Sequence, residues 1–392
     1  MQEIQRVKLH FKRSSDSSVP LYEQIRKYIL ACISNGTLAA GDTIPRITAL
    51  CRDWNVNYRT AKIAFELLER DGAIEWEANK GGTISTPRKI IPLNENEISI
   101  AYLRFRNDPF TSSLTKGFLR FCEELELNHS IIDAGSSHSK IFNSLSHPGA
   151  GINGVVLAPF ETQSYAAAIQ KAIKNGLKVV FLDRSLDEID VSVASADHYM
   201  AAYTASSRLL EIHGRPAYYF GNTDSPSSCR DRVRGWKEAM REFNFLNTDD
   251  YLFGLPMPED VEATNQELAA IHVYQNALML FQTREADIYT VFAENDYMAR
   301  GIYAAAEKMG LRIGEDVFVA SCDNQPFALR LPVPLSTVDM NQKMVGYEGA
   351  KLLYETITGS IPHAINKIVP VEFIERKSSS PSGTAQFATA SA

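Results

Sequence analysis

The chain has 392 residues, of which 45% are hydrophobic and 22% charged, and its formal net charge is −7. These ordinary globular values exclude a fibrous, largely disordered or membrane-embedded chain. The apolar runs are too short to span a membrane, and no apolar export segment follows the positive charges near the start. Five scattered cysteines without a CxxC pair indicate neither a disulfide framework nor a zinc site. We therefore expect a cytoplasmic protein of two or three domains.

The charge is unevenly distributed along the chain. Residues 1–89 contain 14 Lys+Arg and 10 Asp+Glu, whereas residues 90–392 contain 26 and 37. The front segment is therefore positive although the whole chain is negative. A positive segment suits a phosphate-bearing partner such as DNA, but an excess of this size does not identify one without a motif.

The front segment has the pattern of a winged helix. Apolar residues recur every three or four positions from Leu21 to Ile33, which predicts a helix. A second helix is expected over 47–54, and a third begins after Asn57, a good N-cap residue. Two short strand-like runs, 73–77 and 83–86, flank a glycine-containing turn and predict a β-hairpin. In the third helix the expected inward face is formed by Ala61, Ala64, Phe65 and Leu68.

Residues 20–86 resemble the DNA-binding domain of GntR-type bacterial transcription regulators. The resemblance is carried by PLY at 20–22, GTLAAGDTIP at 36–45, VNYRTAK at 56–62, LERDG at 68–72 and GGT at 81–83. In this family the third helix enters the major groove and the wing lies along the minor groove. The resemblance therefore implies double-stranded DNA as a partner. The DNA-contacting positions that it implies are Asn57, Tyr58, Arg59, Thr60 and Lys62 on the helix, and Lys80, Gly81 and Gly82 in the wing.

The chain departs from the usual family pattern at three positions. Arg46 follows Pro45 where the family usually has serine, and Thr48 and Tyr58 stand where it usually has arginine. Arg46 and Arg59 are therefore the candidates for bidentate contacts with bases or phosphates. We expect the wing glycines to let the backbone approach the phosphates closely.

A second, larger domain follows a linker. We place the DNA-binding domain at 1–87, the linker at 88–97, the second domain at 98–376 and a disordered tail at 377–392. Strand-like and helical segments alternate through the second domain, which predicts an α/β fold with parallel sheets. The expected strands are 98–103, 153–158, 178–183, 216–220, 288–293 and 317–322, and the expected helices lie near 112–127, 164–175, 197–212, 230–243, 264–282 and 297–309.

Polar and aromatic residues follow these strands, where α/β folds place their ligands. The segments are 104–110, 159–160, 183–184, 221–230, 295–296 and 323–324. Aromatic faces pack on sugar C–H groups while carboxylates, amides and guanidinium groups bond hydroxyls. This mixture favours a small polyhydroxylated ligand.

Residues 99–375 resemble the periplasmic-binding-protein-like sensor of lactose-repressor-type regulators. The carrying stretches are GVVLAP at 154–159, VVFLDR at 179–184, RDRVRGW at 230–236, AENDYMA at 293–299 and PLSTVD at 334–339. In that family two lobes close on an effector, usually a sugar or a purine. The implied effector-binding residues are Asp183, Arg230 and Asp296, with Phe105, Arg106, Phe110 and Asn324 as further candidates.

Each implied role has a structural alternative. Arg230 would donate a bidentate fork, or else be a surface arginine of a first helical turn. Asp296 would accept from paired sugar hydroxyls, or else cap its helix. For Phe105 and Phe110 the alternative is core packing.

Other protein classes are less compatible with the sequence. The GAGING segment at 149–154 matches GxGxxG but precedes a strand, unlike a dinucleotide fold. His129, His138 and His147 lie in an expected loop region without metal-ligand spacing. A pyridoxal-phosphate-binding body lacks a convincing Schiff-base lysine. A solute-binding transport protein needs an export signal.

The sequence therefore predicts a regulator that is no enzyme and has no cofactor. We expect a homodimer that represses carbohydrate utilisation genes and is released from its operator by a monosaccharide. Two alternatives stay open: a GntR-headed pyridoxal-phosphate-binding regulator or enzyme, and a regulator whose non-sugar effector acts as corepressor.

Overall fold

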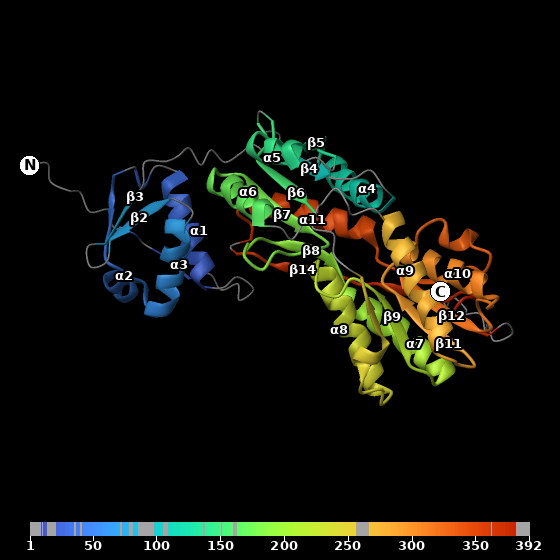
Figure 1. The fold of residues 1–392 in the computed structure, drawn as a ribbon. Coiled ribbons are helices and arrows are strands. Elements are labelled where there is room, and N and C mark those ends of the chain that lie inside the picture. Colours follow the sequence, from blue (N-terminus) through green and yellow to red (C-terminus); the bar gives the residue numbers. More distant parts are fainter. Residues whose placement is uncertain are drawn as a thin grey trace, which may run out of the picture. The chain divides into compact units, whose positions relative to one another are not determined.

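The computed structural model describes most of the chain and divides it into two compact units, residues 1–94 and 95–392 (Figure 1). Each unit is considered by itself below. The described residues are 9, 11–13, 21–34, 37–39, 41–70, 73–77, 81–84, 98–104, 109–135, 138–149, 151–159, 163–255, 266–361 and 363–381. The predicted linker lies outside them at residues 88–97.

The first unit is the predicted three-helix domain with a hairpin. The helices are α1 (Leu21–Ser34), α2 (Ile47–Trp54) and α3 (Tyr58–Arg70). The hairpin strands β2 (Ile74–Glu77) and β3 (Gly81–Ile84) pair antiparallel. A short strand that we did not predict, β1 (Thr43–Ile44), adds to β3 and completes a sheet of order β1-β3-β2.

The third helix has the predicted start and inner face. The Asn57 side chain accepts a hydrogen bond from the Arg59 backbone N–H at 2.8 Å, which satisfies an unpaired donor of the first turn. The predicted inward residues are all buried, and they pack with α1 and α2 around one core: Ala61, Ala64, Phe65 and Leu68. The apolar stripe thus fixes which face of α3 is left outside.

Packing within the DNA-binding domain accounts for glycine at position 81. Its φ is +109°, and a Cβ there would lie 2.5 Å from the carbonyl oxygen of Ile44. Both Gly81 and Gly82 are buried. The close approach that requires glycine is therefore to strand β1, and a close approach to phosphate is not needed to account for it.

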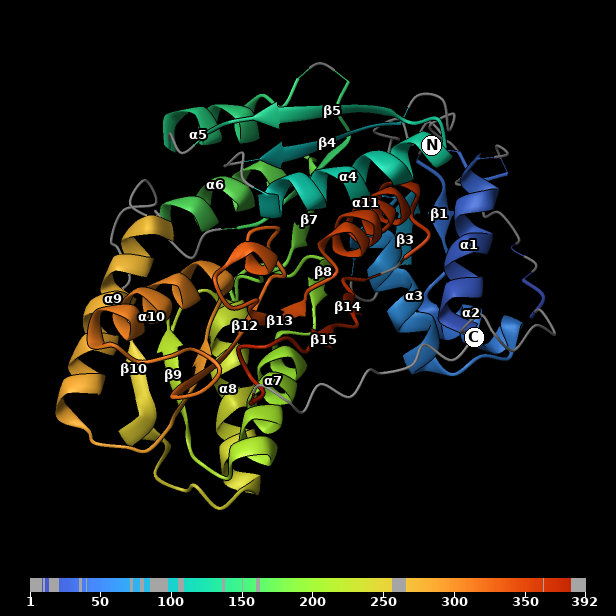
Figure 2. The same cartoon turned by 90° about the vertical axis from the view of Figure 1, so that its right-hand side faces the viewer.

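The second unit contains two lobes, each with a six-stranded sheet (Figure 2). The first sheet has the order β14-β8-β7-β6-β4-β5 and all of its strand pairs are parallel. Helices α4 and α11 pack against one face, and α5 and α6 cover the other. The elements are β4 (Ser99–Arg104), α4 (Pro109–Glu124), β5 (Asn128–Asp133), α5 (His138–Ser146), β6 (Gly154–Leu157), α6 (Gln163–Lys174), β7 (Lys178–Leu182), β8 (Val193–Ala196), α11 (Gln342–Thr358) and β14 (Asn366–Val369).

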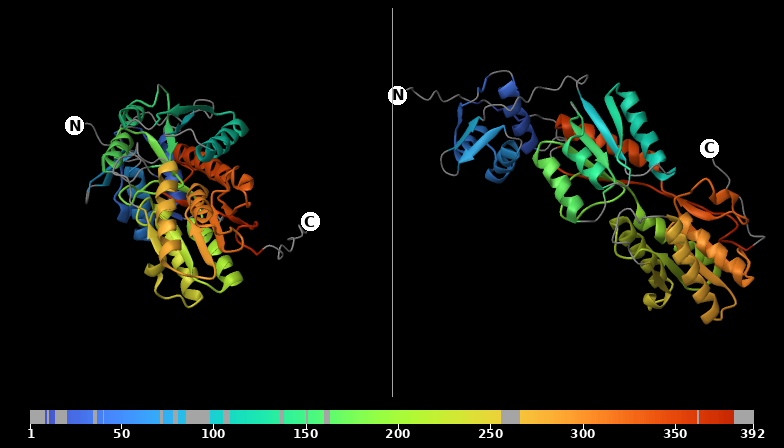
Figure 3. Two further views of the ribbon diagram at one scale, coloured as in Figure 1. Left: turned by 45° about the vertical axis from the view of Figure 1, so that its right-hand side comes forward. Right: turned by 45° about the horizontal axis from the view of Figure 1, so that its top comes forward.

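The second lobe has a sheet of order β10-β9-β11-β12-β13-β15, parallel except for the last pair. Helices α7 and α8 pack on one face, while α9 and α10 enclose a core on the other. The elements are α7 (His198–His213), β9 (Ala217–Gly221), α8 (Ser227–Glu242), β10 (Leu252–Gly254), α9 (Gln266–Thr283), β11 (Tyr289–Ala293), α10 (Asp296–Met309), β12 (Val317–Cys322), β13 (Ser336–Asp339) and β15 (Glu372–Ile374). The predicted parallel α/β fold is confirmed for this unit (Figure 3).

The chain passes between the lobes three times. These crossings follow β8, β13 and β14, and lead into α7, α11 and β15. Both lobes are consequently built from segments that are far apart in the sequence, which is the arrangement of a hinged two-lobed protein.

Two local predictions were wrong. His129 lies in strand β5, whereas we expected a loop. The predicted tail begins too early, because Ser378 and Ser379 are fully buried. The Ser378 hydroxyl donates to the Val319 carbonyl at 2.6 Å and accepts from the Ser336 N–H at 2.7 Å. Residues 377–381 therefore belong to the second lobe. No helix in the described ranges is long and apolar enough to cross a membrane.

Candidate functional site

The proposed DNA-contacting side chains are mostly exposed on the first unit. Tyr58 is 53% exposed, and Arg59 and Lys62 are also exposed at the start of α3. The same holds for Arg46 and Thr48 around the start of α2 and for Asn57, while Thr60 is half-buried. Lys80 lies outside the described residues. Exposure of these groups is what a DNA-reading surface requires.

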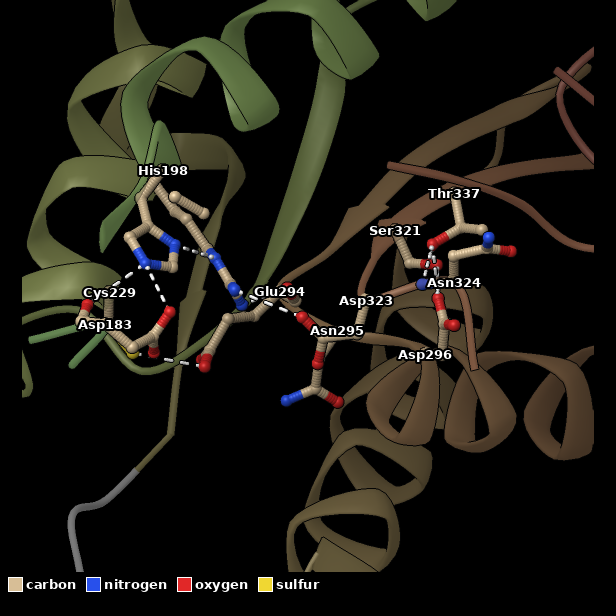
Figure 4. A network of polar contacts seen from close by, with 12 residues as sticks. Asp183, His198, Cys229, Glu294, Asn295, Asp296, Ser321, Asp323, Asn324 and Thr337 are labelled. Atoms are coloured by element: carbon tan, nitrogen blue, oxygen red, sulfur yellow. Dashed lines mark hydrogen bonds and ion pairs between the residues drawn. The ribbon is translucent and has the colours of Figure 1, made fainter. Parts of the chain in front are cut away.

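A buried charged network joins the two lobes of the second unit (Figure 4). Asp183 follows β7 of the first lobe, and His198 begins α7 just after the first crossing. Arg232 lies on α8, while Glu294 and Asp323 follow β11 and β12 of the second lobe. Three strand ends, one helix start and one residue within α8 thus bring their polar groups together, at the position where parallel α/β folds bind ligands. We call these five residues the interlobe network.

Arg232 makes the central contacts of the interlobe network. Its Nη2 lies 3.3 Å from Asp323 Oδ1, and its Nη1 donates to the Glu294 carbonyl oxygen at 2.7 Å. Its Nε donates to His198 Nδ1 at 3.3 Å. Because arginine N–H groups only donate, Nδ1 must accept, so the imidazole hydrogen is on Nε2. That Nε2 lies 3.0 Å from Asp183 Oδ1, which continues the chain of hydrogen bonds into the first lobe.

The electrostatics keep Asp183 charged in this buried place. Burial by itself opposes the charge, but the interactions with His198, Arg184 and Arg232 outweigh it and lower the pKa of Asp183 to about 2. At Asp323 burial prevails over the attraction of Arg232, and the pKa of this carboxyl is raised. Arg232 thus pairs directly with Asp323 and is linked to Asp183 of the first lobe through His198.

The backbone is unusual at equivalent places in the two lobes. Asp183 has a φ of +66° after β7, and Asp323 has a φ of +102° after β12. Non-glycine residues seldom adopt these conformations, and such residues gather at functional sites. The Asp183 carboxylate bonds His198, and the Asp323 carboxylate pairs with Arg232.

Glu294 anchors a second part of the same region. One carboxylate oxygen accepts from the Cys229 thiol at 3.1 Å, and the other accepts from the Asn222 side-chain amide at 3.0 Å. A Cβ on Gly221 would lie 2.4 Å from the Glu294 Cβ, so only glycine at that position admits the glutamate. The strand end of β9 is therefore shaped around this side chain.

The predicted effector residue Arg230 is not part of this network. Its side chain is 36% exposed, bonds the Asp224 carbonyl at 3.1 Å and lies 3.6 Å from the Asp187 carboxylate. Arg232, two positions along, holds the central place instead. The sequence contained a signal that Arg232 is buried. Cys229, Arg232 and Trp236 are spaced by three and four positions and lie on the buried face of α8, so Arg232 interrupts an apolar stripe.

Asp296 accepts hydrogen bonds from groups of its own lobe. It is fully buried, and one carboxylate oxygen accepts from the Ser321 hydroxyl at 2.5 Å and the Thr337 hydroxyl at 2.6 Å. The other accepts from the Gln325 N–H at 2.6 Å. Asn295, not Asp296, caps α10. Asp296 therefore ties together the ends of β12 and β13, and both of its oxygens accept hydrogen bonds from the protein.

Among the other predicted effector residues, the structure describes the side chain of Asn324 alone. The Asn324 amide donates to Asp339 at 3.1 Å and accepts from Arg376 at 2.7 Å. Phe105 and Arg106 lie outside the described residues, and of Phe110 only the backbone, at the start of α4, is described. The sequence prediction did not include His198, Arg232 and Glu294, which the structure brings into the interlobe network.

The titration of Asp296 predicts an unusual pH dependence of stability. Burial and the nearby Asp323 raise its pKa to about 7, so the folded state holds a proton that the unfolded state releases near pH 4. The free energy of unfolding should therefore fall as pH rises from about 4 to about 7. The stabilising contribution of Asp183 is gained as pH rises from about 2 to about 4 and stays constant above that range, so it does not change this decline. Urea unfolding at several pH values should show a shallower decline in Asp296→Asn. The exposed-residue control Asp231→Asn should keep the wild-type profile, and an equally steep decline in Asp296→Asn would contradict the assignment.

Comparisons with known proteins identify both units. The family described as bacterial regulatory proteins, gntR family, matches residues 21–84. The family described as periplasmic binding protein-like domain matches residues 210–379. The chain joins a gntR-family DNA-binding domain to a periplasmic binding protein-like sensing domain. Both resemblances seen in the sequence are thereby confirmed, and the DNA-binding domain is not fused to a pyridoxal-phosphate-binding body.

Curated relatives agree with this assignment. The chain is 25% identical over 278 residues to the NTD biosynthesis operon regulator NtdR of Bacillus subtilis, covering 69% of this chain and 78% of that protein. It is 23% identical over 254 residues to the ribose operon repressor of Haemophilus influenzae, covering 64% and 70%. Together with the match to the gntR family, these relatives indicate that the chain is a transcription regulator and not an enzyme.

Solved structures show the same fold. A LacI family regulator from Enterococcus faecium with bound ribose has a TM-score of 0.59 at 24% identity and covers 72% of this chain and 99% of that chain. A complex of the regulator CelR with cellobiose has a TM-score of 0.61 at 18% identity and covers 82% and 91%. In the described part of this chain, no group of three or more His, Cys, Asp or Glu is placed to hold a metal.

Proposed function

We propose that the chain is a homodimeric repressor of carbohydrate utilisation genes, which a small sugar releases from a pseudo-palindromic operator. The interlobe network carries this proposal, because it places buried donors and acceptors from both lobes at the carboxyl ends of the strands. The ribose-named relative and the ribose-bound LacI family regulator support a sugar as the effector class.

Arg232 is the residue through which an effector would act. Its guanidinium offers several donors in a fixed plane, and it already connects Asp323 of one lobe with the His198–Asp183 pair. A sugar whose hydroxyls bond Arg232, Asp183 or Asp323 would replace some of these hydrogen bonds and change how the lobes are held together. Typical couplings between two sites are about 1–3 kcal/mol, enough to lower DNA affinity roughly 5- to 150-fold.

A second copy of the chain completes the proposed DNA recognition. Two reading helices related by a two-fold axis would meet two half-sites, so the operator would be pseudo-palindromic. Leu268, Ile271 and Met279 support a dimer, since they lie along one face of α9 and are each about half exposed. On each head the proposed contacts are Arg46, Thr48, Asn57, Tyr58, Arg59, Thr60, Lys62 and Lys80. Gly81 and Gly82 are left out of this set because both are buried.

The effector class is tested by thermal unfolding of the full chain against monosaccharides, sugar phosphates, nucleosides and amino acids. A ligand at about 100 times its Kd should add roughly 2.7 kcal/mol to the stability of the sensing domain. We expect a monosaccharide to do so, and Arg230→Ala to keep this response. A response confined to nucleosides or amino acids would contradict the sugar assignment. An effector that strengthens DNA binding would make the chain a corepressed regulator or an activator.

A further inference from the structure

A segment preceding α1 is docked on the DNA-binding domain. Leu9 is 8% exposed and belongs to the core of this domain, and its carbonyl oxygen accepts a hydrogen bond from Trp54 Nε1 at 3.1 Å. The Phe11 ring lies 5.5 Å from the Trp54 ring and 5.6 Å from the Tyr28 ring, measured between centroids. These contacts lie before residue 21, where the gntR-family match begins. We call residues 9 and 11–13 the docked arm.

The docked arm is attached beside the turn that orients the reading helix. Trp54 is the last residue of α2, and Asn55 reverses the chain with a left-handed φ of +51°. The reading helix α3 begins at Tyr58, so no more than about 14 Å of chain separates the anchor from its first residue. Groups carried by the arm are therefore held close to the helix-turn-helix motif.

The docked arm exposes two cations. Leu9 and Phe11 pack inward, whereas Lys12 and Arg13 are exposed. The first 13 residues contain four Lys+Arg and one Asp+Glu, while residues 14–89 contain ten and nine. Most of the net positive charge of the front segment thus lies before the winged helix. Without it the domain is nearly neutral, although sequence-independent DNA affinity depends on cations near phosphates.

Cations elsewhere in the domain are partly offset by acids. Arg26 is buried and pairs with Glu23 at 2.9 Å, so it does not face a ligand. Lys62 on α3 lies 3.4 Å from Glu66. Because these two cations are paired with acids, Lys12 and Arg13 account for a larger share of the positive charge that is available to bind a polyanion.

We infer that the docked arm is an additional DNA-binding element, in which Lys12 and Arg13 contact backbone phosphates beside the bases read by α3. The inference rests on the DNA-binding function of the first domain. Phosphates are the ligand because exposed lysine and arginine side chains at the margin of a reading helix position a protein on the duplex, while bases are read in the groove. The aromatic anchor holds the two cations in place, which lowers the entropy lost on binding.

The test measures binding of the full chain to a fluorescein-labelled random-sequence duplex of roughly 30 base pairs, at several salt concentrations. The double variant Lys12→Ala/Arg13→Ala should flatten the slope of log affinity against log salt by about 1.8 units, because each phosphate contact contributes about 0.9. Between about 50 and 200 mM salt, the affinity of the wild-type chain should therefore fall roughly tenfold more than that of the variant. The matched control Lys171→Ala/Lys174→Ala removes two exposed lysines of α6 in the sensing domain and should leave slope and affinity unchanged.

A second variant tests whether the cations act from a docked arm or would act equally well from an undocked basic segment. Phe11→Ala keeps both cations but removes the ring that packs on Trp54 and Tyr28, so it should also weaken DNA binding, by less than the double variant. An unchanged affinity in Phe11→Ala would overturn the docking, and an unchanged slope in Lys12→Ala/Arg13→Ala would overturn the phosphate contacts. Failure of the wild-type chain to bind any duplex would overturn the DNA-binding function as well. Release by a sugar is measured separately and does not depend on the arm.

Discussion

Replacing Arg232 with alanine should lower the free energy of unfolding of the sensing domain by about 3–5 kcal/mol, the usual cost of removing one partner from a buried ion pair. The Arg232 and Asp323 side chains are 6% and 10% exposed. Without the guanidinium, Asp323 remains buried near Asp183 and loses its cationic partner, and His198 Nδ1 loses its donor. Urea unfolding of the full chain, followed by a signal from the second domain, measures this loss.

The matched control for this prediction lies on the same helix. Arg234 is largely exposed and pairs with Asp231 at 2.7 Å, so Arg234→Ala should change stability by no more than about 1 kcal/mol. Arg232→Ala should also abolish the thermal response to the sugar that Arg230→Ala retains. Equal stabilities of the two variants at positions 232 and 234 would show that the interlobe network does not hold the domain together.

Arg59→Ala should reduce affinity for the chain's own operator by about 1–3 kcal/mol, or roughly 5- to 150-fold, if the side chain reads a guanine. Arg59 is exposed in the first turn of α3, and its backbone N–H is held by the Asn57 cap. An operator duplex selected from random-sequence DNA by the wild-type chain provides the probe, with an unselected duplex for comparison. The loss should be larger on the selected duplex.

The conservative variant Arg59→Lys distinguishes base reading from charge. Lysine retains the positive charge but lacks the planar fork that bonds guanine in two places. Arg59→Lys should therefore recover binding to the unselected duplex and remain weak on the operator. Full recovery on both duplexes would make Arg59 a phosphate contact and leave Arg46 as the candidate for bidentate base contacts.

Local sequence patterns determined much of the secondary structure. The helix at 47–54 and the strand at 317–322 have the predicted bounds, because their ends coincide with changes in apolar periodicity. Several shorter elements were missed, including β8, β13 and β14. Each of them pairs with a strand that is distant in the sequence, which local patterns do not reveal: β8 pairs with β14, and β13 with β15.

The sequence by itself determined the two domains, their order, the parallel α/β fold and the family motifs. These depend on periodicity, capping and spacing within short windows. The tertiary structure alone decided which charged residues meet. It brought together Asp183, His198 and Arg232 from segments separated by a lobe crossing, and left Arg230 outside. It also showed Asp296 to be internally bonded. Hydrogen bonds and burial depend on which faces pack across the fold, and residue type and spacing do not specify that.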